Sequence, residues 1–133
     1  MMKNIQMNYS NLNVEVNLQN KVTLLWDNSG TGKTFLFSIL VSYFQENNIP
    51  FSLFDYKSSE RDILSILKQK TPKDYLLFDN ADLFMTNEIW DEIKSNSAYS
   101  IISIKSFEDY SLEGVGICIV DFNESTLKLE DLT

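Results

Sequence analysis

The sequence predicts an α/β fold, a three-layer sandwich with a mainly parallel sheet, to which an N-terminal β-hairpin and a C-terminal antiparallel strand are added. Two observations predict it. Short apolar runs, such as residues 22–26 and 75–78, alternate with segments of helical period, and such runs are typical of parallel strands covered on both faces. The sequence also shows no linker, internal repeat or low-complexity tract. Residues 1–133 are therefore predicted to form a single domain, in which residues 1–20 are an added hairpin.

The elements of the first half follow in chain order. Apolar and polar residues alternate over residues 4–19, on either side of the turn-forming pair Ser10 and Asn11, which predicts a half-exposed hairpin. Residues 22–26 supply the first strand of the sheet core. Residues 33–45 form a helix that is apolar on many sides. We expect it to be buried on several of them, as a helix packed across a sheet is.

The second half continues the alternation of strands and helices. Ser59 and Asp62 form a capping-box pattern, which opens a helix over residues 60–70. The other expected elements are strands at 51–54, 75–78, 101–104 and 116–120, a helix at 87–95, and a last strand around 127–129 after a turn at 123–124.

Charge and composition limit the classes of function that the chain can have. The chain has 19 acidic and 11 basic residues, a net charge of −8, no histidine, Arg61 as its sole arginine and Cys118 as its sole cysteine. Binding to nucleic acid needs clustered Lys and Arg, so we expect no direct nucleic-acid ligand. The acidic surface instead suits a basic protein partner. No stretch approaches the ~20 apolar residues that cross a bilayer, and no secretory signal opens the sequence, so we expect a cytoplasmic protein without membrane contact.

Residues 22–35, VTLLWDNSGTGKTF, have the order of a phosphate-binding P-loop: an apolar strand, a Gly-rich turn, then Lys, Thr and a helix. Backbone N–H groups of such a turn point at an anion, and the helix adds its positive N-terminal end. The Lys then reaches the β- and γ-phosphates, and the Thr hydroxyl coordinates Mg²⁺. The nucleotide-binding residues predicted by this motif are Asn28, Ser29, Gly30, Thr31, Gly32, Lys33, Thr34 and Phe35. The competing interpretation is a chance Gly/Ser/Thr loop between a strand and a helix.

The first position of the motif departs from its pattern. Asp27 stands where the motif has glycine, and it brings a carboxylate toward a site meant for polyanions. Either this side chain points away from the ligand, or the affinity for a triphosphate is reduced.

Asp79 is the second candidate for nucleotide chemistry. It ends the apolar run YLLF, a Walker B pattern in which the Asp holds Mg²⁺ from a strand near the P-loop. Ligands of open parallel sheets lie at the carboxyl ends of the strands, where this residue falls. The alternative is an Asp that closes a strand and begins a turn.

The order SGTGKT, LLFDNAD and then Ser103 at the end of the next strand resembles the P-loop NTPases of the AAA+ type, in particular the compact cores of bacterial replication initiators and helicase loaders. The resemblance covers about residues 20–105. It implies a P-loop NTPase sheet with ATP and Mg²⁺ as ligands. It also implies that, within the sheet, the Walker B strand and its neighbour lie between the P-loop strand and the second strand of the chain's core. It also implies a sensor role for Ser103. Lys105 lends a charge near the γ-phosphate, or is a solvated strand-end lysine.

The sequence departs from that family in its catalytic accessories. In the family an acidic residue, usually Glu, follows or lies close to the Walker B Asp and polarises the attacking water. Here Asn80 follows directly, and the next carboxylate is Asp82, which serves either as this base or as a helix or turn cap. The family also uses an arginine finger and a helical lid. The residues after Ser103 read as strands, so we expect no lid in this sequence, and Arg61 suits a surface ion pair better than a finger. The predicted catalytic residues are Lys33, Asp79, Asn80 and Asp82, and the predicted magnesium ligands are Thr34 and Asp79.

These features predict an ATP-binding P-loop protein with slow or partner-stimulated, Mg-dependent hydrolysis, coupled to a regulatory interaction with another protein or a second copy of the chain. The alternative is a non-hydrolysing scaffold with a vestigial P-loop. A small-molecule kinase usually needs several arginines to hold polyanionic substrates, so the single Arg counts against that third class.

Overall fold

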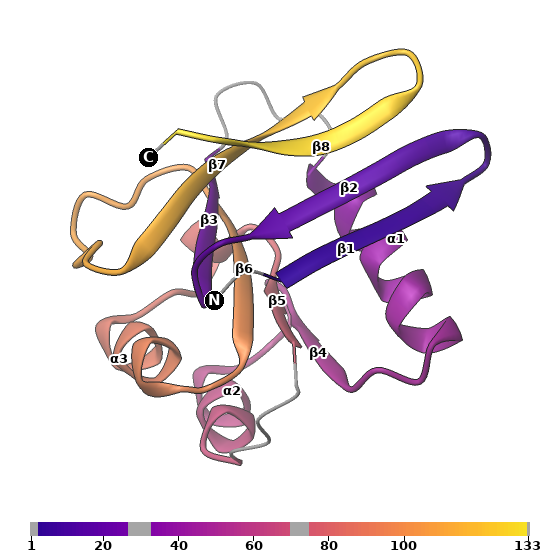
Figure 1. The fold of residues 1–133 in the computed structure, drawn as a ribbon. Coiled ribbons are helices and arrows are strands. Elements are labelled where there is room, and N and C mark those ends of the chain that lie inside the picture. Colours follow the sequence, from indigo (N-terminus) through magenta and orange to yellow (C-terminus); the bar gives the residue numbers. More distant parts are fainter. Residues whose placement is uncertain (1–2, 27–32, 70–74, 133) are drawn as a thin grey trace.

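The computed structural model describes residues 3–26, 33–69 and 75–132 (Figure 1). The strands in these ranges are β1 Lys3–Tyr9, β2 Leu12–Leu18, β3 Val22–Trp26, β4 Phe51–Phe54, β5 Tyr75–Phe78, β6 Tyr99–Ile104, β7 Val115–Phe122 and β8 Thr126–Asp131. The helices are α1 Lys33–Glu46, α2 Glu60–Leu67 and α3 Asn87–Ser95, with a 3-10 turn, η1, at Ala81–Leu83.

The strands form one sheet in the order β1-β2-β8-β7-β3-β6-β5-β4. Strands β7, β3, β6, β5 and β4 run parallel to one another. Strands β1 and β2 pair antiparallel, β2 pairs parallel with β8, and β8 pairs antiparallel with β7. Strands β6 and β5 therefore lie between β3 and β4, the placement that the resemblance implies.

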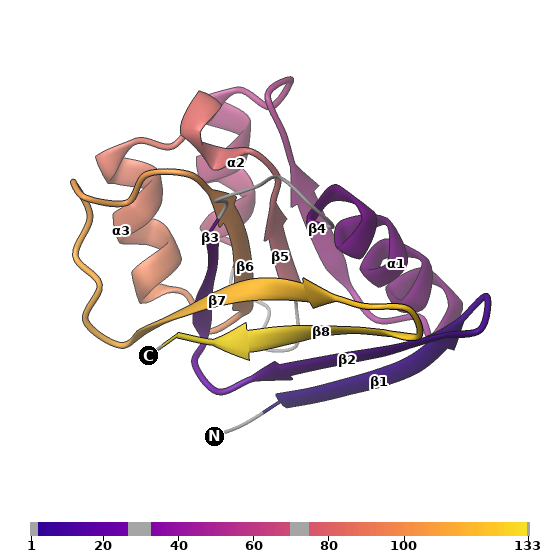
Figure 2. The same ribbon diagram turned by 90° about the horizontal axis from the view of Figure 1, so that it is seen from above.

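The predicted fold class, a three-layer sandwich with a mainly parallel sheet, is wrong. The sheet is mixed and curls into a half-barrel, and 39% of the described residues lie in strands against 29% in helices. Strands β1, β2 and β8 bend over α1 instead of extending the sheet flat (Figures 1 and 2). The hairpin and the last strand, expected as additions, are an integral wall of the molecule.

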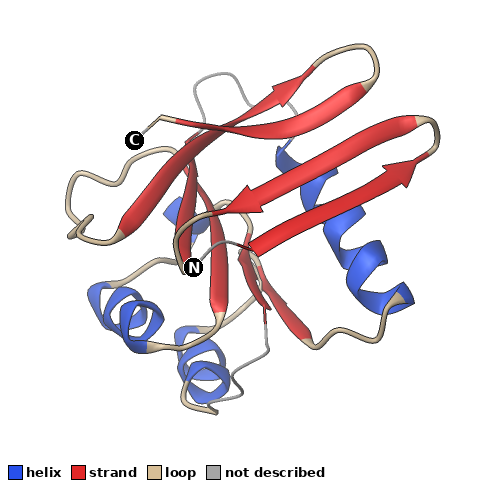
Figure 3. Ribbon diagram, viewed as in Figure 1, coloured by secondary structure: helices blue, strands red, loops and turns tan. Residues whose placement is uncertain are grey.

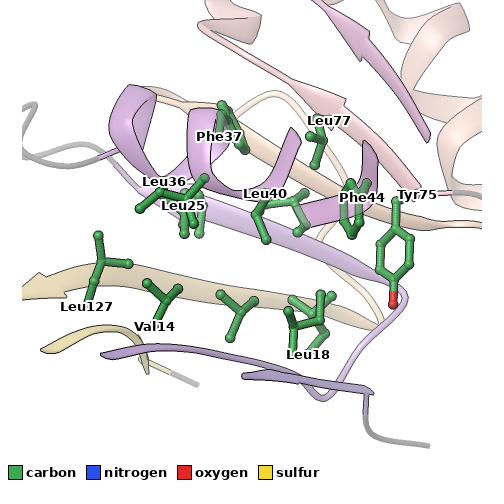
Figure 4. Close-up of a cluster of buried hydrophobic side chains, with 14 of the residues drawn as sticks. Val14, Leu18, Leu25, Leu36, Phe37, Leu40, Phe44, Tyr75, Leu77 and Leu127 are labelled. Atoms are coloured by element: carbon green, nitrogen blue, oxygen red, sulfur yellow. The ribbon is translucent and has the colours of Figure 1, made fainter. Parts of the chain in front are cut away.

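The apolar character of α1 explains the curl. The helix buries Leu36, Phe37, Ile39, Leu40 and Phe44, on more sides than one layer of sheet can cover. The burial pattern of β2 alternates with a period of two, so each of its inward residues turns toward the helix. Figure 4 shows the side chains of Val14, Leu18 and Leu127 pointing toward those of the helix. The helix thus packs its buried side against the concave side of the sheet, while residues such as Ser38 and Glu46 remain exposed.

Helices α2 and α3 cover the opposite face of the parallel strands (Figure 3). Ile63 of α2 and Ile89 of α3 are fully buried against Phe78 and Ile102 of the sheet. As expected, Ser59 caps α2, since its hydroxyl accepts a hydrogen bond of 3.1 Å from the backbone N–H of Asp62. The helix ends at Leu67, earlier than residue 70.

The hairpin turn is confirmed where the sequence places it. Ser10 and Asn11 both have positive φ, 48° and 67°, as a two-residue type I′ turn requires. The register pairs Tyr9 with Leu12 and Ile5 with Val16, so the apolar residues of both strands share one face.

Candidate functional site

The carboxyl ends of the parallel strands and the N-terminus of α1 meet at one edge of the sheet. Helix α1 begins at Lys33, after β3. The predicted binding residues Asn28, Ser29, Gly30, Thr31 and Gly32, together with Asp27, lie outside the described residues. The site is therefore built from the first turn of α1 and from the residues that follow β5, β4 and β6.

Lys33 opens α1 with a side chain that is only 6% exposed. A buried ammonium needs nearby negative charge or acceptor atoms. One such charge is Asp79, because Lys33 acts to lower the pKa of that carboxyl. Thr34 follows and is exposed. The two residues at which the motif places the phosphate-binding ammonium and the metal-binding hydroxyl thus begin the helix next to the end of β5.

Asp79 is the central acidic group of the site. Its Oδ1 atom is buried and has no hydrogen-bond partner among the described residues. Burial raises the pKa of this carboxyl, and the neighbouring charge of Asp55 raises it further, while Lys33 and the backbone N–H of Asn80 act in the opposite direction. A carboxylate with an orphaned oxygen beside another negative charge is a group that a cation would stabilise.

Asp55 is a site residue that the sequence analysis missed. It follows β4, and Phe54 pairs with Phe78 in the sheet, so Asp55 and Asp79 are neighbours at the ends of adjacent strands. The backbone N–H of Asp79 donates to the carbonyl of Phe54 at 2.9 Å. The signal that identified Asp79, a carboxylate directly after a short apolar run, is also present at residues 51–55.

Asp55 also shapes the loop in which it lies. Its Oδ1 accepts a hydrogen bond of 2.9 Å from the backbone N–H of Lys57, and its own N–H donates to the Ser58 hydroxyl at 3.1 Å. These bonds form a compact turn of the kind that Asp favours. The turn fixes the backbone that carries the carboxylate beside Asp79.

A pocket of about 330 Å³ opens beside these residues, between the first two turns of α1 and the ends of β4 and β5. Its lining residues are Thr34, Phe37, Ser38, Val41, Leu53 and Asp79. The four helical members lie at the spacing of one helix face. The hydroxyl of the predicted metal ligand Thr34 and the carboxylate of Asp79 therefore border the same space.

The hydrogen bonds of Asp82 argue against its predicted role as the catalytic base. It lies in η1 and is exposed, and its Oδ2 and Oδ1 accept hydrogen bonds from the backbone N–H groups of Lys105 and Ser106 at 2.6 and 3.1 Å. Both carboxylate oxygens thus tie the turn after β5 to the loop after β6. Of the two interpretations left open by the sequence, these contacts favour the structural one.

Asn80 and Ser103 occupy the edges of the site. Asn80 has left-handed backbone angles, φ 53° and ψ 53°, and an exposed position that turns the chain from β5 into η1. Ser103 is 1% exposed and pairs with Leu25 of β3. Because Ile101 of the same strand packs in the cluster around α1, Ser103, two residues on, faces the helix as well. Lys105 and Arg61 are exposed, and Arg61 lies in the first turn of α2, on the other face of the sheet.

The oxygen donors present fit magnesium. Mg²⁺ is usually held by one or two carboxylates, retained waters and substrate phosphates. Asp79 and Thr34 supply a carboxylate and a hydroxyl at one pocket, with Asp55 next to them. Across the described ranges no cluster of three or more His, Cys, Asp or Glu residues could form a metal cage, so a magnesium ion held here would take its remaining ligands from a bound molecule and water.

Comparison with models of protein families finds no match, and no curated protein matches the chain. Each helix in the described part of the chain is too short or too polar to cross a membrane.

Proposed function

We propose that the protein binds Mg·ATP at the N-terminus of α1. The observation that carries this proposal is the buried, unpartnered Oδ1 of Asp79, which lies beside Asp55 and within the electrostatic reach of Lys33. This combination of a buried ammonium, two carboxylates and the Thr34 hydroxyl at a helix N-terminus suits a triphosphate with its divalent cation. The placement of β6 and β5 between β3 and β4 also supports it.

Each residue has a defined task in this proposal. Lys33 holds the phosphates, and Thr34 and Asp79 would hold the magnesium ion, which supplies charge neutralisation at the β- and γ-phosphates. Asp55 is the carboxylate placed to orient and deprotonate a water, since it neighbours Asp79 and both oxygens of Asp82 are bonded to backbone. Asn80 orients a water without accepting its proton.

Hydrolysis is slow in this account unless a partner helps. Arg61 is the sole arginine of the sequence and lies in the first turn of α2, which packs on the opposite face of the sheet from α1. A finger arginine contributes about 10³ to 10⁵ in rate, so a substantial stimulation requires another chain. Nucleotide binding then orders the loops at this edge for a protein partner or a second copy of the chain.

A cytoplasmic location is part of the proposal. Burial raises the pKa of Cys118 to about 11, so its thiol stays protonated and unreactive near neutral pH. A single, inert, unbridged cysteine suits a reducing compartment.

A stability titration tests the proposal. The free energy of unfolding of the full chain is measured by urea denaturation, with Mg²⁺ and rising ATP. At about 100 times the dissociation constant, ATP is expected to add about 2.7 kcal/mol. Asp79→Asn should lose most of this gain, whereas Asp91→Asn, an exposed acidic position on α3, should keep it. No gain with ATP, ADP, GTP or GDP would contradict nucleotide binding and favour the scaffold alternative.

A further inference from the structure

Three aromatic rings from distant parts of the sequence meet beside the first turn of α1. The ring centroids of Tyr9 and Phe35 are 6.1 Å apart in an edge-to-face arrangement, and those of Phe35 and Phe122 are 6.0 Å apart. The residues come from the end of β1, the start of α1 and the end of β7. We call Tyr9, Phe35 and Phe122 the aromatic platform.

The platform is exposed where an aromatic cluster of the core would be covered. Tyr9 is 38% exposed, Phe35 is 40% exposed and Phe122 is 50% exposed. By contrast, Phe44 and Phe78, which also make ring contacts, are fully buried. Rings that contact one another and still offer faces and edges to solvent are suited to a flat partner.

The position of the platform relative to the phosphate site identifies that partner. Successive residues of a helix are turned by about 100°, so Phe35 projects to a different side of α1 from its neighbour Thr34. Thr34 borders the pocket toward β4 and β5, while Phe35 contacts residues of β1 and β7. The helix N-terminus therefore has an acidic, metal-binding flank and an aromatic flank.

We propose that the aromatic platform binds the nucleobase of the nucleotide whose phosphates lie at Lys33 and Thr34. This inference rests on the proposed function. Base stacking on aromatic side chains needs no hydrogen-bond readout, so the platform accepts adenine and guanine alike and favours purines over pyrimidines through their larger stacking face. Hairpin β1–β2, which supplies Tyr9, thereby becomes part of the binding site.

The test separates the base from the phosphates. Isothermal titration calorimetry in Mg²⁺ compares ATP, GTP, CTP and inorganic tripolyphosphate on the full chain. Tyr9→Leu and Phe122→Leu, which keep apolar bulk and remove the ring, are expected to weaken ATP binding by roughly 5- to 150-fold each. Their affinity for tripolyphosphate should stay within about twofold of the wild-type value, and Tyr9→Phe should restore ATP binding.

Tyr43→Leu provides the matched control, because it makes the same ring-to-leucine change at a partly buried position near the opposite end of α1. It should leave the ATP affinity unchanged at temperatures where the variant is folded. Wild-type protein that binds tripolyphosphate as tightly as ATP, or ring variants that bind ATP normally, would overturn the platform and leave the phosphate site standing. Ring variants that convert a dimer to a monomer in sedimentation without a loss of ATP affinity would overturn it as well. Wild-type protein that binds neither ligand would overturn the proposed function itself.

Discussion

The two halves of the sheet differ in strand direction, in covering and in what their ends carry. Strands β3, β6, β5 and β4 are parallel, have helices on both faces and end in polar residues such as Asp79 and Asp55. Strands β1, β2 and β8 include an antiparallel pair and press one apolar face onto α1. One helix therefore contributes to both halves, since α1 packs in the core of the curled half and its N-terminus is the proposed phosphate site of the parallel half.

The largest expected effect tests whether the curled half is integral to the core. Leu18 of β2 and Leu77 of β5 are 1% and 0% exposed in the same cluster. Leu18→Ala and Leu77→Ala should each lower the free energy of unfolding by about 2–5 kcal/mol in urea denaturation.

The control for this pair is Leu83→Ala, because Leu83 is 67% exposed. It should change stability by less than about 0.5 kcal/mol. A Leu18→Ala cost near that of the control would mean that the hairpin is an appendage, as the sequence analysis expected.

A smaller loss of stability is expected when the contact of Asp82, in the turn after β5, with the loop after β6 is removed. Asp82→Ala leaves the backbone N–H groups of Lys105 and Ser106 without their carboxylate acceptor, at a cost of about 1–3 kcal/mol. The affinity for Mg·ATP should stay close to wild type. A variant of unchanged stability with lost ATP turnover would instead identify Asp82 as the base.

The charge of Asp79 predicts the direction of a pH effect in the absence of ligand. Its pKa is raised in the folded state by burial and by Asp55, so the folded protein binds this proton more tightly than the unfolded chain does. The group therefore destabilises the fold at neutral pH. This cost is relieved as pH falls through the raised pKa toward the ordinary value of 3.8. The pH dependence of urea denaturation should show this component in wild type but not in Asp79→Asn. An identical profile in both proteins would contradict it.

The smallest effect concerns the turn of the curled half. Asn11 has φ 67°, where glycine is at no steric disadvantage. Asn11→Gly should raise stability by a few tenths of a kcal/mol, or leave it unchanged, in thermal unfolding, whereas Asn11→Val should lower it by about 1–2 kcal/mol. Equal melting temperatures for the Gly and Val variants would contradict the type I′ geometry.

Local patterns in the sequence predicted the individual helices and strands well, but they did not predict which distant strands pair with one another. Strand β3, strand β5 and helix α3 begin and end where their apolar patterns do. The curl of the sheet could not be predicted from the sequence, because the pairing of β2 with β8 joins residues more than a hundred positions apart. For the site, Asp79 was identified by the apolar run YLLF before it, and Asp55 follows a run of the same length, FSLF, which Ser52 makes less apolar. The bonds of Asp82 to the loop after β6 required the fold.

The central claim is that the N-terminus of α1 holds the phosphates of Mg·ATP, and calorimetric titration of Mg·ATP into wild type and Lys33→Met tests it most directly. Because Lys33 is buried at that terminus, Met preserves its apolar stem and removes the charge. The account predicts one binding site per chain in wild type and at least a tenfold weaker affinity in folded Lys33→Met, since a charge-assisted contact contributes about 1.5–3 kcal/mol. Equal affinity in the two proteins, or no binding heat in wild type at any temperature tried, would contradict it.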